Sequence, residues 1–288
     1  MRFKRDEKLK KHTSFRIGGP AEYFCVAKST DQIREALRFA KEKKLPVAVI
    51  GAGSNILVRD EGFPGLVIKN SLNTLEIDGS RVRVGSGIPL GKLVSALRKR
   101  GIGGLEFLVG IPGSVGGAIV MNSGAWGKEI GDLVEKVKVI DRNGQETVFT
   151  RGQMGFGYRK SRLQKGKLIV TEVELRLRRK IRKAIAKKIQ EYIAKRKDKQ
   201  PVGSPNCGST FKNPKKDFAA RLIEQAGFKG MRVGDAQVSP KHANFIVNLG
   251  DATAKDVLKL MMLIQTRVKS KFGIKLEPEL KIMVKSAT

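Results

Sequence analysis

The sequence contains no long apolar run. Nowhere in its 288 residues does it approach the ~18 consecutive apolar residues that a membrane-spanning helix needs. The N-terminal stretch MRFKRDEKLKKHTSF is basic and lacks the apolar core of a secretory signal. We therefore expect a cytoplasmic protein that does not insert into a membrane.

Cysteine is also scarce, with two residues in the chain. Cys25 and Cys207 lie far apart and show none of the spacings of a metal-ligand motif. A structural disulfide would be unusual in the cytoplasm. We therefore expect neither a metal site nor a disulfide framework.

Acidic residues are few compared with basic ones, 27 against 58, which gives a net charge of +31. Such an excess can attract nucleic acid or membrane phosphate, and it can steer anionic substrates. Between Arg176 and Gln200, 12 basic residues face 2 acidic ones, a net of +10. Apolar residues at helical spacing predict that this stretch is an amphipathic helix with a basic outer face: they are Ile181, Ala184, Ile185, Ile189 and Ile193. That face is either simply solvated or binds polyanions; without a nucleic-acid-binding motif, we expect no specific nucleic-acid partner.

Glycine, by contrast, is concentrated in two loops. Six glycines lie in GIPGSVGGAIVMNSGAWG at 110–127, and GAGSNILV at 51–58 follows the apolar run Val47–Ile50. Glycine permits positive φ and close backbone approach to a ligand, and successive bare amides form a concave anion site. One such loop alone would favour an ordinary tight turn. Two of them, placed after strands, favour a phosphate-bearing cofactor.

The remaining pattern predicts alternating strands and helices in three regions. Thr30, Pro89, Asp217 and Asp251 mark predicted helix starts, and Asn143-Gly144 marks a type I′ hairpin between strands at 134–141 and 146–150. Other predicted strands share loose apolar alternation; they are 21–28, 47–50, 66–69, 81–85, 168–177, 243–249 and 280–284.

Six motifs in order resemble one family. They are HTSFRIGGP at 12–20, GAGSNILV at 51–58, GIPGSVGGAI at 110–119, YRKSR at 158–162, GSTFKNP at 208–214 and LEPEL at 276–280. The chain resembles the UDP-N-acetylenolpyruvoylglucosamine reductases, bacterial flavoenzymes of peptidoglycan precursor synthesis and hence of cell-wall growth and division. No insertion separates YRKSR from the basic helix, so the chain is similar to the shorter, type II-like subtype.

This resemblance implies an α+β fold with a vanillyl-alcohol oxidase-like FAD-binding domain. Its two αβ subdomains would span residues 1–78 and 79–198, and a substrate-binding domain would span 199–288, with the last strand able to return to the FAD domain. FAD would bind non-covalently through residues of both glycine loops. These are Gly51, Ala52, Gly53, Ser54, Asn55, Ile56, Gly113, Ser114, Gly116, Gly117, Ala118 and Asn122. The sequence lacks the G-x-G-x-x-G pattern of the ordinary dinucleotide fold.

The resemblance also implies the reaction, in which NADPH is co-substrate and the enolpyruvyl ether of a UDP-sugar is reduced. Arg159 would bind the substrate carboxylate, Ser209 would donate the final proton, and Glu279, rather than its rival Glu277, would share a proton with the developing charge. Substrate contacts are expected from four further residues, Tyr158, Lys212, Asn213 and Lys241. We expect a monomer.

Two other classes remain open on the sequence. One is a flavin oxidase of the same fold acting on another alcohol or sugar, and the other is a non-enzymatic polyanion-binding protein suggested by the charge. The sequence does not decide between NADPH and NADH, and it does not explain the +31 charge.

Overall fold

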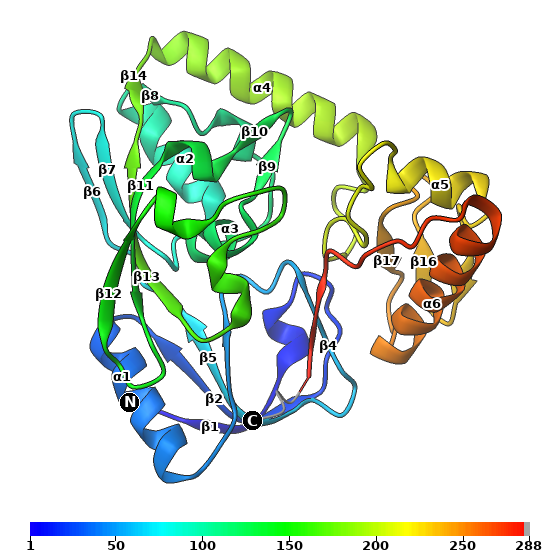
Figure 1. Cartoon of the computed structure of the whole chain (residues 1–288), viewed down its shortest axis with the longest axis horizontal. Coiled ribbons are helices and arrows are strands. Elements are labelled where there is room, and N and C mark those ends of the chain that lie inside the picture. The colour runs from blue at the N-terminus through cyan, green and yellow to red at the C-terminus, as the bar shows by residue number, and fades with distance from the viewer. Residues whose placement is uncertain (285–288) are drawn as a thin grey trace. The chain divides into compact units, whose positions relative to one another are not determined.

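The computed structural model describes residues 1–284, which form two compact units (Figure 1). Unit 1 contains residues 1–4, 24–52 and 66–195, and unit 2 contains residues 5–23, 53–65 and the chain from Arg196 onward. This division differs from the predicted boundaries at 78 and 198, because residues 5–23 and 53–65 cluster with the C-terminal part. The physical reason is a shared core: Phe15, Ile17 and Leu57 are buried among side chains of the C-terminal region.

Unit 1 is built around an antiparallel sheet in the order β12-β11-β13-β7-β6. Its strands are β6 (Leu75–Asp78), β7 (Arg81–Gly85), β11 (Val134–Ile140), β12 (Glu146–Thr150) and β13 (Ile169–Arg176). In β13, Val173 and Leu175 are buried and alternate with the more exposed Glu172 and Glu174. The alternation places one face of the strand in the core and the other toward charged neighbours.

Helices α2 (Leu90–Lys99) and α3 (Val115–Met121) contribute the apolar side chains that cover this sheet. Pro89 is the residue before α2, so the predicted start is confirmed. Helix α4 (Arg182–Lys199) is the predicted basic helix. Its apolar face is narrower than expected, because Ile185 is buried whereas Ile181 and Ile193 are exposed.

The hairpin at Asn143-Gly144 forms, but with a different turn. Gly144 has φ +83°, whereas Asn143 does not have the positive φ that a type I′ turn requires. The Asp141 carboxylate accepts hydrogen bonds from the amides of Asn143 and Gln145 and shapes a longer loop. The strands pair as predicted, from Ile140–Glu146 to Lys136–Thr150.

A second sheet, in the order β1-β2-β5-β3, carries the first glycine loop. Its strands are β1 (Lys4–Lys8), β2 (Pro20–Ala27), β3 (Val47–Ile50) and β5 (Phe63–Asn70). Helix α1 (Thr30–Glu42) is capped by Ser29, whose hydroxyl accepts from the Gln32 amide, and not by Thr30 as predicted. The parallel pairing of β3 with β5 fixes where the loop after Ile50 begins.

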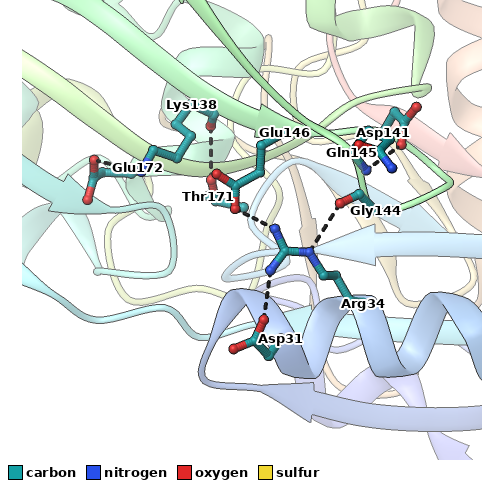
Figure 2. Close-up of polar contacts among 9 residues, drawn as sticks. All are labelled: Asp31, Arg34, Lys138, Asp141, Gly144, Gln145, Glu146, Thr171 and Glu172. Atoms are coloured by element: carbon teal, nitrogen blue, oxygen red, sulfur yellow. Dashed lines mark hydrogen bonds and ion pairs between the residues drawn. The ribbon is translucent and has the colours of Figure 1, made fainter.

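Arg34 of α1 ties this helix to the β11–β12 hairpin within unit 1 (Figure 2). Its guanidinium donates to the Gly144 carbonyl, to Asp31 and to Glu146. The Asp31 and Glu146 carboxylates raise the pKa of Arg34 above its ordinary value. The two segments are 110 residues apart in sequence, so one side chain connects the two predicted FAD subdomains.

Unit 2 packs two helices against a short antiparallel sheet in the order β15-β16-β17 (Figure 1). Its elements are β15 (Arg232–Val233), β16 (Ala236–Val238), β17 (Ile246–Asn248), α5 (Ala219–Gln225) and α6 (Ala254–Phe272). Thr253, not the predicted Asp251, caps α6 and forms a reciprocal capping box with Asp256. The inward side chains of α6 are core residues, as predicted.

The last strand β18 (Lys281–Met283) pairs in parallel with β4 (Ile56–Val58), so the chain end returns to the glycine-loop segment. Smaller pairings join β8 (Ile102–Gly103) to β14 (Arg178–Arg179) and β9 (Gly124–Ala125) to β10 (Lys128–Glu129). The structure also contains short 3-10 helices, at Leu9–His12, Glu106–Leu108, Ile130–Leu133, Gly152–Met154 and Arg162–Lys165. Among the described residues, no helix combines the length and apolarity needed to cross a membrane.

Candidate functional site

The two glycine loops touch each other within unit 1. A Cβ placed on Gly51 would lie 2.1 Å from the Ser114 Oγ, which is closer than any side chain tolerates. The absence of a side chain at Gly51 therefore lets the loops meet with the Ser114 hydroxyl in its present position. Ala52 and Gly117, which follow in each loop, are exposed. Loops far apart in sequence thus present accessible backbone at one place, which suits a shared diphosphate ligand.

Not every residue of the second glycine loop is available to a cofactor. The Gly116 amide donates to the Ser86 carbonyl at 2.7 Å, and a Cβ on Gly116 would press on Ser86. Ser114 caps α3, accepting from the Gly117 amide at 3.4 Å. Gly116 therefore serves close packing, whereas Gly113, Gly117 and Ala118 remain candidates for cofactor contact.

Asn122 ends α3, and its side chain is hydrogen-bonded to three other residues of unit 1. Its backbone is in the left-handed conformation, with φ +45°. Its side-chain oxygen accepts from the Gly131 amide at 2.9 Å, and its nitrogen donates to the Gly157 carbonyl at 3.0 Å and to Glu129. The amide is thus engaged with protein atoms, so the expected direct contact with the cofactor is not what this geometry favours.

The second half of the first loop is anchored inside unit 2. Gly53 has φ +65°, and a Cβ there would fall 2.0 Å from the His12 carbonyl oxygen. The Ser14 amide donates to the Gly53 carbonyl at 3.1 Å. Asn55 donates through its side chain to the Glu279 carbonyl at 3.2 Å, and Ile56 opens β4. The motif segments at 12–20, 51–58 and 276–280 therefore meet in unit 2.

Arg159 is held in unit 1 at the tip of a tight turn. The amides and carbonyls of Gly157 and Lys160 bond each other in both directions, at 3.1 and 2.9 Å. Arg159 has φ +52°, a conformation that costs energy for a side chain of this size. Its guanidinium donates to the Gly124 carbonyl at 3.3 Å and lies 5.1 Å from the ring centroid of the half-exposed Tyr158. A strained, oriented guanidinium is typical of a binding site.

Trp126 is a feature that the sequence analysis missed. It sits in the β9–β10 hairpin with φ +58°, next to the strand whose Gly124 carbonyl holds Arg159. Its ring stacks on Tyr192 of α4 at 5.9 Å, and the Lys195 ammonium lies 5.6 Å from its centroid. The signal was present in the sequence, because a lone tryptophan followed by glycine within a glycine-rich stretch is an unusual turn residue.

The segments that carry Ser209 and Glu279 meet in unit 2 through a short antiparallel pairing, in which Thr210 lies opposite Glu279. Phe211 lies opposite Pro278, the Glu279 amide donates to the Thr210 carbonyl at 2.8 Å, and the Lys212 amide donates to the Glu277 carbonyl at 2.8 Å. Gly208, with φ +82°, turns the chain just before Ser209. The GSTFKNP and LEPEL motifs are thus one structural element.

The structure distinguishes the two rival glutamates. Glu277 is exposed and pairs with Lys212 at 3.2 Å. Glu279 is half-buried. Burial raises the pKa of the Cys207 thiol to about 12, with a smaller contribution from the Glu279 charge. The less exposed carboxyl is the better candidate for proton sharing, and Cys207 itself stays protonated.

The remaining predicted substrate residues have protein partners in unit 2. The Asn213 side-chain oxygen accepts from the Ala219 amide at the start of α5, at 3.0 Å. Lys241 donates to the Lys197 carbonyl at 2.6 Å. Burial lowers the pKa of the nearby His242, whose Nδ1 accepts from the Asn244 amide. These contacts order the loops around the Ser209 element.

Comparison with known proteins gives the family. The "FAD binding domain" family model matches residues 21–150, and the "UDP-N-acetylenolpyruvoylglucosamine reductase, C-terminal domain" model matches residues 200–283. The chain is 49% identical over 283 residues to UDP-N-acetylenolpyruvoylglucosamine reductase 2 of Symbiobacterium thermophilum, covering 98% of this chain and 92% of that one. It is 45% identical over 280 residues to the enzyme of Desulforamulus reducens, covering 96% and 92%.

The crystal structure of UDP-N-acetylenolpyruvylglucosamine reductase from Thermus caldophilus is also similar, with a TM-score of 0.86, 40% identity, and coverage of 99% of this chain and 100% of that one. The expected α+β class, the FAD-binding domain and the assignment as an FAD-dependent oxidoreductase are thereby confirmed. The chain belongs to the UDP-N-acetylenolpyruvoylglucosamine reductase family.

Proposed function

We propose that this protein uses NADPH to reduce the enolpyruvyl group of UDP-N-acetylglucosamine enolpyruvate to UDP-N-acetylmuramate. The names of its relatives support the reaction. The observation that supports it in this chain is the backbone pairing of the Ser209 loop with the Glu279 segment, which joins the two motifs that carry the proposed proton donor and carboxyl.

FAD, when bound, transfers a hydride from NADPH to the methylene carbon of the substrate. The residues of this chain that fit the cofactor lie on the two glycine loops, where Gly51 allows close approach and Ala52 and Gly117 are exposed. Backbone amides of these loops would hold the diphosphate non-covalently. Ser54 and Asn55 add polar side chains to the first loop, and Ser114 fixes the second.

Arg159 binds the substrate carboxylate. A planar guanidinium can donate two parallel hydrogen bonds to a carboxylate, and negative charge grows on that group as hydride adds to the neighbouring methylene. The left-handed turn and the Gly124 carbonyl keep the guanidinium in one orientation before substrate arrives. Such preorganisation lowers the free energy of the charged transition state.

Glu279 and Ser209 handle the protons. The Glu279 carboxyl shares a proton with the carboxylate oxygens while charge is delocalised onto them. The Ser209 hydroxyl then gives its proton to the carbon that bears the ether oxygen, and it regains a proton from solvent. A serine hydroxyl is a weak acid, so a cationic neighbour would assist it; Lys212 is the candidate, although its ammonium pairs with Glu277 at 3.2 Å.

The UDP diphosphate of the substrate requires cations. Lys212 and Lys241 are the candidates from the loops beside the Ser209 element, with Asn213 and Tyr158 as further polar contacts. We propose that the enzyme works as a monomer in the bacterial cytoplasm; sedimentation at micromolar concentration tests the first part, and a dimer mass would contradict it.

Purified protein tests the function directly. We expect a yellow flavin spectrum, consumption of NADPH faster than of NADH, and formation of UDP-N-acetylmuramate from the enolpyruvyl substrate. Glu279→Gln should lower turnover far more than Glu277→Gln. Rapid reoxidation of the flavin by air without substrate would instead indicate an oxidase, and a colourless protein that binds polyanions would reject the enzyme assignment.

A further inference from the structure

Thr210 carries a buried hydroxyl with no hydrogen-bond partner. Its exposure is 1%, and across residues 1–284 its Oγ1 is the one buried side-chain nitrogen or oxygen without a partner. Burying an unpaired hydroxyl destabilises the folded state. Such a group in a folded protein calls for a reason, and a functional site is one of the common ones.

The strand pairing places Thr210 beside Glu279. The Glu279 amide donates to the Thr210 carbonyl, so the two residues lie directly opposite each other. Opposite residues of an antiparallel pair project to the same face, with Cβ atoms about 4.5–5.5 Å apart. The flanking residues agree with this register, since Lys212 and Glu277 form an ion pair.

The opposite face of this pairing is apolar. Phe211 and Leu280 are both buried in the unit 2 core. Thr210 and Glu279 alternate with these residues along their two segments, so the hydroxyl and the carboxyl share the other face.

The backbone around Thr210 is fixed from its second edge. The Thr210 amide donates to the Asn244 carbonyl at 2.8 Å, and the Asn244 side chain bonds both the amide and the carbonyl of Phe211, at 3.0 and 2.8 Å. Only the Thr210 side chain is left to reorient. Rotation about one side-chain bond therefore decides where its hydroxyl points.

We propose that Thr210 is a positioning residue whose hydroxyl donates a hydrogen bond to the Glu279 carboxyl during the substrate half of the reaction. This inference rests on the proposed function, in which Glu279 shares a proton with the substrate carboxylate. The bond fixes the orientation of the carboxyl.

Thr210→Val removes the hydroxyl and keeps the shape of the side chain. We expect the recovery of flavin absorbance on addition of enolpyruvyl substrate to slow by about 10-fold to 100-fold, the cost of one hydrogen bond to a charged group. Bleaching of the flavin by NADPH should not change. Thr210→Ser, which keeps the hydroxyl, should restore the rate.

Thermal unfolding gives a second readout. Thr210→Val should unfold at the same temperature as the wild type or a few degrees higher, because it deletes an unpaired buried oxygen. The matched control is Thr171→Val: Thr171 is equally buried, but its Oγ1 donates to the Lys138 carbonyl at 3.2 Å. That variant should unfold at a lower temperature and keep the substrate step unchanged.

A Thr210→Val enzyme with wild-type kinetics overturns the inference, whether or not its unfolding temperature falls. Glu279→Gln separates this failure from failure of the proposed function: a wild-type substrate step in Glu279→Gln rejects the role of Glu279 itself. If Glu279→Gln blocks that step while Thr210→Val does not, only the role of Thr210 is rejected. Should the valine variant not fold, Thr210→Ala is judged by the same two half-reactions.

Discussion

Asp60 caps a helix that begins 194 residues later in the chain. Its two carboxylate oxygens accept from the amides of Ala254 and Lys255, at 2.8 and 3.0 Å, within unit 2. Thr253 satisfies the third amide of α6, that of Asp256, at 3.1 Å. Two side chains thus satisfy the first three amides of a 19-residue helix, and one of them belongs to the segment that carries the first glycine loop.

Replacing Asp60 with alanine removes the acceptors of two helix amides. Lys255 is exposed, so water can replace its partner, whereas Ala254 is fully buried and its amide loses a hydrogen bond. We expect the free energy of unfolding to fall by about 1–2 kcal/mol. The unfolding temperature should fall by roughly 2–8 °C for a chain of this size.

Circular dichroism on heating measures the stability, and a flavin titration measures the affinity for FAD. Asp60→Ala should weaken FAD binding as well, because Asp60 anchors residues 53–58 to α6. Thr253→Ala is the control, since it uncaps the same helix without touching the glycine-loop segment. Asp60→Asn, which keeps one oxygen, should be intermediate. An Asp60→Ala protein with wild-type unfolding temperature would refute this account of the anchor.

Three more predictions follow from single side chains. Gly51→Ala should weaken FAD binding, because its Cβ would displace the Ser114 Oγ, which lies 2.1 Å from that position. Gly91→Ala in α2, with open space around its Cβ, should bind FAD normally, and equal titrations of the two variants would contradict this. Arg159→Gly should change the free energy of unfolding by no more than about 1 kcal/mol, because glycine adopts the left-handed conformation without strain. The same variant should lower turnover at least about 100-fold, and retained turnover would remove Arg159 from the mechanism. Burial lowers the pKa of His242 below its ordinary value of 6.5, so below pH 6.5 the unfolded chain binds more protons than the folded one and the free energy of unfolding should fall as pH drops. Urea titrations at several pH values measure this dependence. His242→Gln should make the free energy of unfolding less dependent on pH, and an unchanged dependence would reject the assignment.

The sequence predicted the elements of the fold better than their ends. Periodic apolar positions fixed α2 and α6, and the strand before the first glycine loop was placed correctly. The second glycine loop was expected after a strand as well, but it follows the 3-10 helix Glu106–Leu108. Two predicted capping residues were wrong because several residues able to cap a helix lie close together in the sequence: Thr30 follows Ser29, and Asp251 precedes Thr253. Which of two neighbours caps a helix depends on backbone angles that no residue type dictates.

Long-range pairing explains the larger misses. Strand β4 was not predicted because Ile56–Val58 reads as part of a glycine loop, and its partner β18 lies more than 220 residues away. The same pairing assigns residues 53–65 to unit 2 rather than to the first predicted domain. Thr210 could not be singled out for the same reason, since its burial and its place opposite Glu279 arise only when two distant segments meet.

The motifs themselves were informative about the site, because glycine and turn residues constrain the backbone locally. Gly208 turns the chain at Ser209, and Gly51 permits contact with Ser114. Polar residues within the motifs were harder to interpret. The side-chain oxygens of Asn122 and Asn213 accept from protein amides, and the expected ligand contacts of both residues stay predictions. Residue type alone does not separate these two uses of asparagine.

Stopped-flow measurement of the two half-reactions of Ser209→Ala tests the central claim most directly. The account predicts that NADPH still bleaches the flavin at the wild-type rate, while the enolpyruvyl substrate no longer restores its absorbance at a useful rate. Equal loss in both half-reactions, or wild-type recovery with substrate, would contradict the assignment of Ser209 as proton donor.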